Sequence, residues 1–260
     1  MAGKKIAVTG KGGVGKSTLA AALALLLSKE GGEVLAFDSD PDANLAQALG
    51  ISHAEQSKIV PISKQIALIE ERTGAKVNRY GQVFKLNPEV HDVADKFAYK
   101  RGNISLLVLG AIQAGGSGCA CPENVFAQSL TTDLVLFQNQ TLIMDMEAGI
   151  EHLGRSTVKG VDVVVCVVEP GQRSIDAAIT IDRMAREIGL QHVEFVANKV
   201  ANAGEEDYVR EQLPSEPLGI IPYSDTIRAA DRDGVSVLDT ASPELVAIYQ
   251  EILDKLEVCA

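Results

Sequence analysis

GKGGVGKST, residues 10–18, satisfies the phosphate-binding pattern G-x-x-x-x-G-K-[ST]. An apolar segment of strand character, residues 6–9, precedes it, and a helical pattern, residues 17–28, follows it. The glycines allow backbone N–H groups to turn inward onto phosphate oxygens, and the positive end of the following helix favours the same anion. The stretch therefore predicts a nucleotide-binding strand–loop–helix unit near the start of the chain.

Beyond this unit, apolar segments of strand length alternate with longer helical patterns. Further strands are expected at residues 34–37, 106–109, 142–144, 161–168, 193–197 and 218–221, and further helices from about residue 122 and over residues 174–188 and 243–256. The alternation is typical of an α/β fold, a mostly parallel sheet with helices on both faces. The sequence has no repeat or linker, so one domain is predicted over residues 1–260, although residues 59–100 carry no usable motif.

Composition argues against two classes of partner. The net charge is −11, the sequence has no Trp, and no run of Lys and Arg forms a basic face, so we expect no nucleic-acid partner. The longest apolar run, residues 19–27, is too short to span a bilayer, so we expect no membrane partner. No signal peptide precedes the first strand, and four cysteines make no disulfide framework, so a cytoplasmic location is expected.

The phosphate-binding motif and two segments that carry Asp, DSDPD at residues 38–42 and TLIMD at residues 141–145, predict an ATP or ADP site with Mg²⁺. Lys16 would reach the β- and γ-phosphates, and the Ser17 hydroxyl would bind Mg²⁺. The apolar strand TLIMD ends at Asp145, as a Walker B strand does, and Asp145 would hold Mg²⁺ through water. The loop residues expected to bind the nucleotide are Gly12, Gly13, Val14, Gly15, Lys16, Ser17 and Thr18.

Cys119 and Cys121 place two thiols one residue apart, just before Pro122, which suits the first turn of a helix. The helix dipole favours a thiolate there. Two thiolates are half of a four-ligand site, and a two-fold dimer supplies the other half. We therefore predict one Ni²⁺ or Zn²⁺ ion shared across a homodimer; a [4Fe–4S] cluster or an ordinary pair of thiols is the alternative. Cys166 is expected to be a small core residue.

The additional lysine of the loop, Lys11, extends the pattern to K-G-G-x-G-K-[ST]. This resembles the deviant Walker A motif of the ATPase family that includes MinD, ParA and the nitrogenase iron protein. The resemblance implies that Lys11 crosses a dimer interface and touches the partner's nucleotide. It also implies that Asp40, in the segment DSDPD, orients the attacking water, that Asp38 lies near the magnesium, and that the Gly149 backbone senses the γ-phosphate.

On the adenine side, the same resemblance implies contacts from Asn198 and Lys199, which follow a strand, and from Pro222 in the segment IPY. Three stretches taken together, residues 11–16, 118–123 and 145–155, look like the CooC-type accessory ATPases. These help to insert nickel into carbon monoxide dehydrogenase, and close relatives serve acetyl-CoA synthase. The resemblance implies an ATP-hydrolysing metallochaperone in which nucleotide closes the dimer around the metal and hydrolysis releases the metal to the client enzyme.

Two other functions remain open. A MinD- or ParA-like positioning ATPase would need a basic amphipathic membrane helix or a DNA-binding face. The amphipathic segment at residues 251–257 is acidic, so anionic lipid would repel it. An iron–sulfur reductase resembling the nitrogenase iron protein would take its cluster cysteines from two well-separated positions, whereas Cys119 and Cys121 are nearly adjacent.

Overall fold

The computed structural model describes residues 3–77, 79, 81–112, 121–149 and 160–259. Cys119 and the predicted signature residues 150–155 lie outside the described residues. The strands are β1 Lys5–Gly10, β2 Val34–Asp38, β3 Tyr99–Arg101, β4 Ile104–Val108, β5 Thr141–Asp145, β6 Val163–Val168, β7 Val193–Val200 and β8 Gly219–Pro222.

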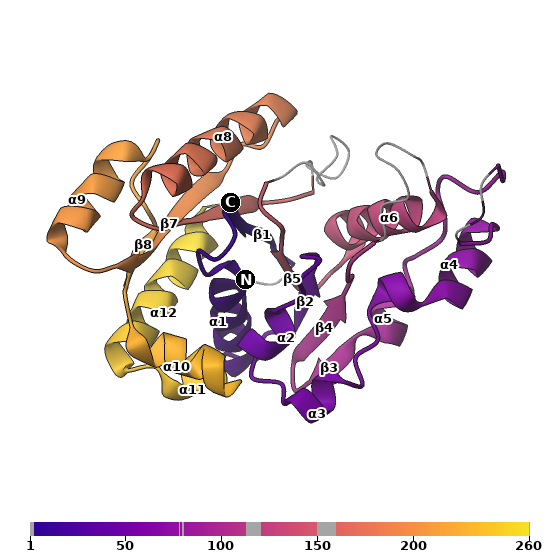
Figure 1. Ribbon diagram of the computed structural model, residues 1–260, viewed down its shortest axis with the longest axis horizontal. Coiled ribbons are helices and arrows are strands. Elements are labelled where there is room, and N and C mark those ends of the chain that lie inside the picture. The colour runs from indigo at the N-terminus through magenta and orange to yellow at the C-terminus, as the bar shows by residue number, and fades with distance from the viewer. Residues whose placement is uncertain (1–2, 78, 80, 113–120, 150–159, 260) are drawn as a thin grey trace.

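These strands form one sheet of eight in the order β3-β4-β2-β5-β1-β6-β7-β8 (Figure 1). Every neighbouring pair is parallel except β3 with β4. Because parallel strands all end at the same edge, the loops that follow β1, β2, β5 and β7 gather at the carboxyl edge of the sheet. The predicted α/β fold is confirmed.

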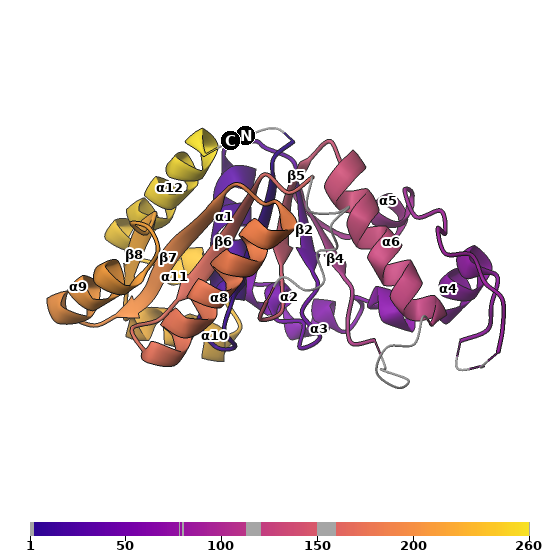
Figure 2. The same cartoon turned by 90° about the horizontal axis from the view of Figure 1, so that it is seen from above.

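Helices cover both faces of the sheet (Figures 1 and 2). Their bounds are α1 Lys16–Lys29, α2 Leu45–Ala48, α3 His53–Gln56, α4 Ile66–Thr73, α5 Val93–Phe97, α6 Pro122–Phe137, α8 Gln172–Ile188, α9 Ala203–Gln212, α10 Asp225–Asp233, α11 Val237–Thr240 and α12 Pro243–Val258. One face packs against α1, α2, α11 and α12, and the other against α4, α5, α6, α8 and α9. None of the described helices is long and apolar enough to cross a membrane.

The two cores follow from the pleat of the strands. In β6, Val163, Val165 and Val167 belong to the core under α1, whereas alternate residues, including Cys166, belong to the core under α8. A central strand must therefore be apolar at every position, which is why these segments read as continuous apolar runs. Cys166 is 1% exposed, and burial raises the pKa of its thiol to about 12, so the prediction of a core residue is confirmed.

The segment that carried no motif, residues 59–100, supplies one edge of the molecule. It forms a short 3-10 helix at Ile62–Lys64, then α4 and α5, and ends in β3, which pairs with β4 antiparallel. The strand expected at residues 106–109 begins two residues earlier, at Ile104, because the turn that joins β3 to β4 places Ile104 opposite Arg101.

Candidate functional site

The phosphate-binding loop joins β1 to α1 at the carboxyl edge of the sheet. At its first residue, Gly10, φ is 140° and an added Cβ would lie 2.3 Å from the Val167 carbonyl oxygen, so only glycine fits between β1 and β6. At its last residue, Gly15 caps α1 with φ 102°, and the first turn of α1 contains no acidic residue. The positive end of the helix is therefore unopposed and available to an anion.

A cleft of about 500 Å³ opens beside this loop. Of the predicted nucleotide residues, those that line it are Gly12, Gly13, Gly15, Lys16, Ser17, Thr18, Asn198, Lys199 and Pro222. Val14 is fully buried behind the loop, and the partly exposed Lys11 lies outside this lining. The fold therefore brings the loop after β1 together with the ends of β7 and β8, which lie about 180 to 210 residues further along the sequence.

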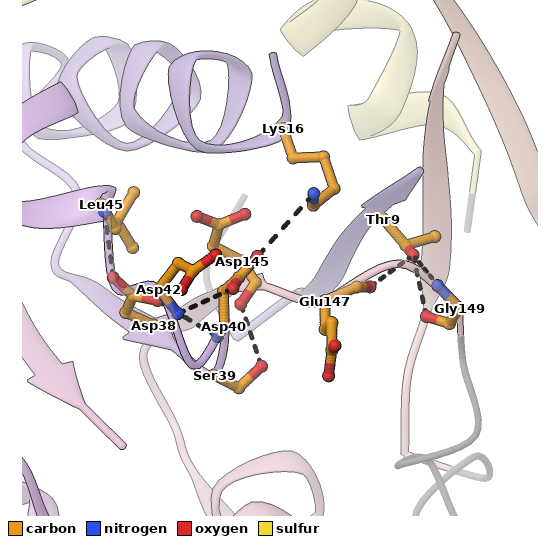
Figure 3. A network of polar contacts seen from close by, with 10 residues as sticks. All are labelled: Thr9, Lys16, Asp38, Ser39, Asp40, Asp42, Leu45, Asp145, Glu147 and Gly149. Atoms are coloured by element: carbon orange, nitrogen blue, oxygen red, sulfur yellow. Dashed lines mark hydrogen bonds and ion pairs between the residues drawn. The ribbon is translucent and has the colours of Figure 1, made fainter. Parts of the chain in front are cut away.

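Two buried carboxylates stand side by side at the ends of β2 and β5, where Asp38 pairs with Asp145 in register. Both residues are fully buried. The Asp38 carboxylate accepts hydrogen bonds from the backbone N–H groups of Asp40 at 3.3 Å and Leu45 at 3.0 Å (Figure 3). Burial, together with the charge of Asp145, raises the pKa of Asp38 to about 8. Asp38 thus holds the loop that follows β2.

Asp145 is differently placed, because neither of its carboxylate oxygens has a well-formed hydrogen bond from any described residue. Burial raises its pKa to about 6, against the lowering effects of the Ser17 side chain and the charge of Lys16. A buried carboxylate without partners is costly unless a cation satisfies it. Hard oxygen ligands from Asp145 and Ser17, beside a phosphate loop, suit Mg²⁺, so the residues present fit the predicted magnesium site.

The segment after β2 is fastened to the end of β5. Both the backbone N–H and the hydroxyl of Ser39 donate to the Asp145 carbonyl oxygen, each at 2.9 Å. Asp40 is thereby brought over the loop, with its Oδ2 atom 3.8 Å from the ammonium of the largely buried Lys16. Ser39 was not singled out from the sequence. The apolar strand before it indicated only that the next residues would reach this edge.

Thr9, the penultimate residue of β1, holds the start of the segment that follows β5 (Figure 3). Its buried hydroxyl lies 2.8 Å from the Gly149 carbonyl oxygen and 3.1 Å from that of Glu147, and it accepts the Gly149 N–H at 3.3 Å. The sequence reasoning missed Thr9, although a hydroxyl in an otherwise apolar central strand was a signal. The Gly149 N–H expected to sense a γ-phosphate is bound here to Thr9.

The sequence model of the family described as the CobQ/CobB/MinD/ParA nucleotide binding domain matches residues 5–237. The chain belongs to this family. The match spans the phosphate loop, both buried carboxylates and the ends of β7 and β8.

Curated relatives and solved structures agree with the family. The chain is 44% identical over 236 residues to the carbon monoxide dehydrogenase accessory protein CooC of Rhodospirillum rubrum, covering 90% of this chain and 89% of that protein. It is 42% identical over 254 residues to an uncharacterized ATP-binding protein of Methanocaldococcus jannaschii, covering 96% and 97%. The cell division ATPase MinD of Pyrococcus furiosus shares the fold, with a TM-score of 0.70, 19% identity and coverage of 99% and 100%. The predicted resemblance to CooC-type proteins is confirmed.

Within this family fold, Cys121 lies at the N-cap of α6, with Pro122 in the first turn as expected. The thiol is partly buried, and this burial raises its pKa although the backbone N–H of Asn124 favours the thiolate. The predicted effect of the helix end is therefore present but weaker than desolvation. Among the described residues, no group of three or more His, Cys, Asp and Glu side chains could hold a metal ion. Cys119, the proposed second thiol, lies outside them.

Proposed function

We propose that this chain is an ATP-hydrolysing metallochaperone that dimerises, binds Ni²⁺ through Cys119 and Cys121, and assists nickel insertion into carbon monoxide dehydrogenase or acetyl-CoA synthase. The observation that carries the proposal is that a thiol and the nucleotide site share one edge of the sheet. Cys121 is the N-cap of α6, the helix that follows β4, so it lies at the same carboxyl edge as the phosphate loop and Asp145. Similarity over nine-tenths of the chain to a carbon monoxide dehydrogenase accessory protein supports this choice of client.

For hydrolysis, the chain's own residues divide the work between phosphate and water. Mg²⁺, held by Ser17 and through water by Asp145, would neutralise charge on the phosphate oxygens. Lys16, whose side chain is 7% exposed, is pointed into the cleft and would contact the β- and γ-phosphates. Asp40 lies beside Lys16 with its side chain 17% exposed, so its carboxylate can reach a water molecule at the γ-phosphate and orient it.

We propose a dimer because each chain holds only part of the nucleotide site and half of the metal site. Lys11 lies outside the lining of its own cleft, so its ammonium is available to the nucleotide of a second copy across a two-fold axis. The same axis would bring two Cys-x-Cys pairs together around one Ni²⁺ ion, which is the cargo. A cation from the partner placed near the transferring phosphoryl group would make hydrolysis depend on the closed dimer.

Coupling between nucleotide and metal would run through the segment after β5. The Gly149 N–H is bound to the Thr9 hydroxyl at 3.3 Å. We infer that a γ-phosphate competes for this N–H, so that ATP but not ADP releases Gly149 from Thr9 and frees the start of the segment after β5. Thr9 would then set the difference between the two nucleotide states.

Replacing Thr9 by the isosteric valine tests this coupling. In Thr9→Val the Gly149 N–H loses its partner in the ADP state only, so we expect the ratio of the ADP to the ATP-analogue dissociation constant to rise by about fivefold. Titration with a fluorescent ADP and a non-hydrolysable ATP analogue measures the ratio. Thr180→Val, which removes an exposed hydroxyl bonded to the Asp176 carbonyl, is the control and should change nothing. An unchanged ratio in Thr9→Val would remove Thr9 from the coupling.

Metal analysis of cysteine variants tests the proposed function directly. Wild-type protein with Ni²⁺ and an ATP analogue should elute as a dimer with about one nickel per two chains. The variant Cys119→Ala/Cys121→Ala should lose the nickel but keep ATP binding. Cys259→Ala is the matched control because Cys259 is also partly exposed, yet lies at the end of α12. Nickel retained by the double variant, or a monomer under saturating ligands, would contradict the proposal.

A further inference from the structure

The carboxyl end of β7 is irregular at the two residues that line the nucleotide cleft. The pairing of β7 with β8 shifts register between Ala197 and Val200. Lys199 has φ 61°, a left-handed conformation that a residue with a side chain adopts only at a cost of about 1–3 kcal/mol. Such a bulge changes the direction of the side chains it carries. In a regular strand, consecutive side chains point to opposite faces, whereas here Asn198 and Lys199 both contact the phosphate loop.

Each of these side chains binds a backbone carbonyl of the loop. The Asn198 amide donates to the Val14 carbonyl oxygen at 2.7 Å, and the Lys199 ammonium donates to the Gly13 carbonyl oxygen at 2.5 Å. Both side chains are in turn held: the Asn198 side-chain oxygen accepts the Lys199 N–H at 2.9 Å, and the Lys199 ammonium lies 3.3 Å from the Glu169 carboxylate. Two successive peptides of the loop are thus tied to the end of β7.

Because a trans peptide is planar, fixing its carbonyl also fixes the N–H that points the opposite way. With the Val14 carbonyl turned towards Asn198, the N–H of Gly15 is turned away from β7, at the start of α1, where a phosphate would bind. With the Gly13 carbonyl turned towards Lys199, the N–H of Val14 faces the Lys11 carbonyl oxygen at 3.4 Å, which closes the turn that carries Lys11.

Asn198 can approach the phosphate-binding loop closely because the residue it faces, Gly15, has no side chain. Asn198 is 7% exposed, and a Cβ added to Gly15 would lie 2.3 Å from its amide nitrogen. The glycine at this position therefore serves Asn198 as well as the turn. One of the two N–H donors of the Asn198 side-chain amide is used in the bond to the Val14 carbonyl oxygen.

We propose that Asn198 and Lys199 are positioning residues that hold the phosphate-binding loop ready for phosphates. This rests on the proposed binding of nucleotide at the cleft. A bond to the loop and a contact with adenine are separate roles of one amide, and the two roles differ in which ligands they affect. A positioning residue acts on every ligand that carries the phosphates, with or without a base.

Affinities for three ligands separate the roles. For magnesium tripolyphosphate, which has no base, we expect Asn198→Ala to weaken binding by about tenfold, and for MgATP and MgGTP by at least as much. Lys199→Ala, at an exposed side chain, should weaken all three by about threefold, and Lys199→Arg, which keeps a donor, should restore binding. Tyr223→Ala, at the far end of the cleft and 45% exposed, is the comparison: it should weaken ATP binding and leave tripolyphosphate binding unchanged.

The outcomes are distinct. An Asn198→Ala protein that loses affinity for the nucleotides but not for tripolyphosphate would assign Asn198 to the base alone and overturn the proposal. Unchanged affinities in both alanine variants would do the same while leaving the proposed function intact. Wild-type protein that fails to bind MgATP would contradict the proposed function and this inference together. Thermal unfolding of each variant shows whether a loss of affinity is caused by a loss of folded protein. If Asn198→Ala is unfolded, the exposed Lys199 variants still decide whether these residues position the loop.

Discussion

Asp145→Asn is expected to lower ATP hydrolysis by at least about 100-fold and yet to stabilise the nucleotide-free protein. Hydrolysis falls because the carboxylate that would hold the magnesium is gone. The stability gain has a separate origin. Asp145 is fully buried without a well-formed hydrogen bond from the described residues, and Asp38 lies next to it, so folding buries a carboxylate that Ser17 and Lys16 compensate only in part. Asparagine keeps the shape and removes the charge.

The sign of the pH dependence follows from the raised pKa values. Burial raises the pKa of Asp145 to about 6 and that of Asp38 to about 8, from the ordinary aspartate value of 3.8. Between about pH 4 and about pH 8, the folded protein binds more protons than the unfolded chain, so its free energy of unfolding decreases as the pH rises. The advantage of Asp145→Asn should therefore be small near pH 4 and about 3 kcal/mol at about pH 8, because each unit of raised pKa corresponds to about 1.4 kcal/mol.

Urea denaturation of the two proteins without nucleotide or Mg²⁺, at an acidic and an alkaline pH, measures this difference. Asp239→Asn, at an exposed position, should change neither stability nor hydrolysis. Added Mg²⁺ should narrow the gap, because the cation stabilises only the wild-type carboxylate. An Asp145→Asn protein that is less stable than the wild type at alkaline pH would show that the carboxylate has a stabilising partner in the folded chain.

Lys11→Ala is expected to lower hydrolysis by about 1,000-fold while each chain still binds ATP. Lys16, not Lys11, lines the cleft of its own chain, so the affinity for nucleotide should change little. The loss arises because the partner's site lacks a cation at the transferring phosphoryl group. Single-turnover hydrolysis and equilibrium titration measure the two effects separately, and Lys64→Ala, at an exposed position on the 3-10 helix, is the control.

A mixture of the two inactive variants tests action in trans. In a mixed dimer, the Asp145→Asn chain provides Lys11 to the partner, whose own Asp145 is intact, so one of the two sites is complete. Random exchange makes half of the dimers mixed, and the mixture should regain about a quarter of wild-type activity. Failure to regain activity, with dimers present by light scattering, would place Lys11 in the site of its own chain and remove the reason for a shared active site.

Much of the nucleotide site could be predicted from the sequence because its parts are local. The nine residues of the loop contain their own turn, their own anion-binding N–H groups and the start of a helix. The apolar strand TLIMD likewise ends in an acid that is visible in the sequence. Continuous apolar strands alternating with helices then indicated the parallel sheet. Helices α9 and α10 were missed because both are polar overall and each buries few residues, Val209 in one and Ala230 in the other, so neither contains a long apolar pattern.

By itself, the sequence determined which loop binds phosphate, which acids end strands and that two thiols precede a helix, since each is a property of neighbouring residues. Only the tertiary structure decided how the acids differ: strand order sets Asp38 beside Asp145, and the return of the next loop gives hydrogen bonds to one and none to the other. It also brought Thr9 to Gly149, and a bulge turned Asn198 and Lys199 onto the loop. Such contacts depend on register and on a single left-handed residue, which short-range patterns do not encode.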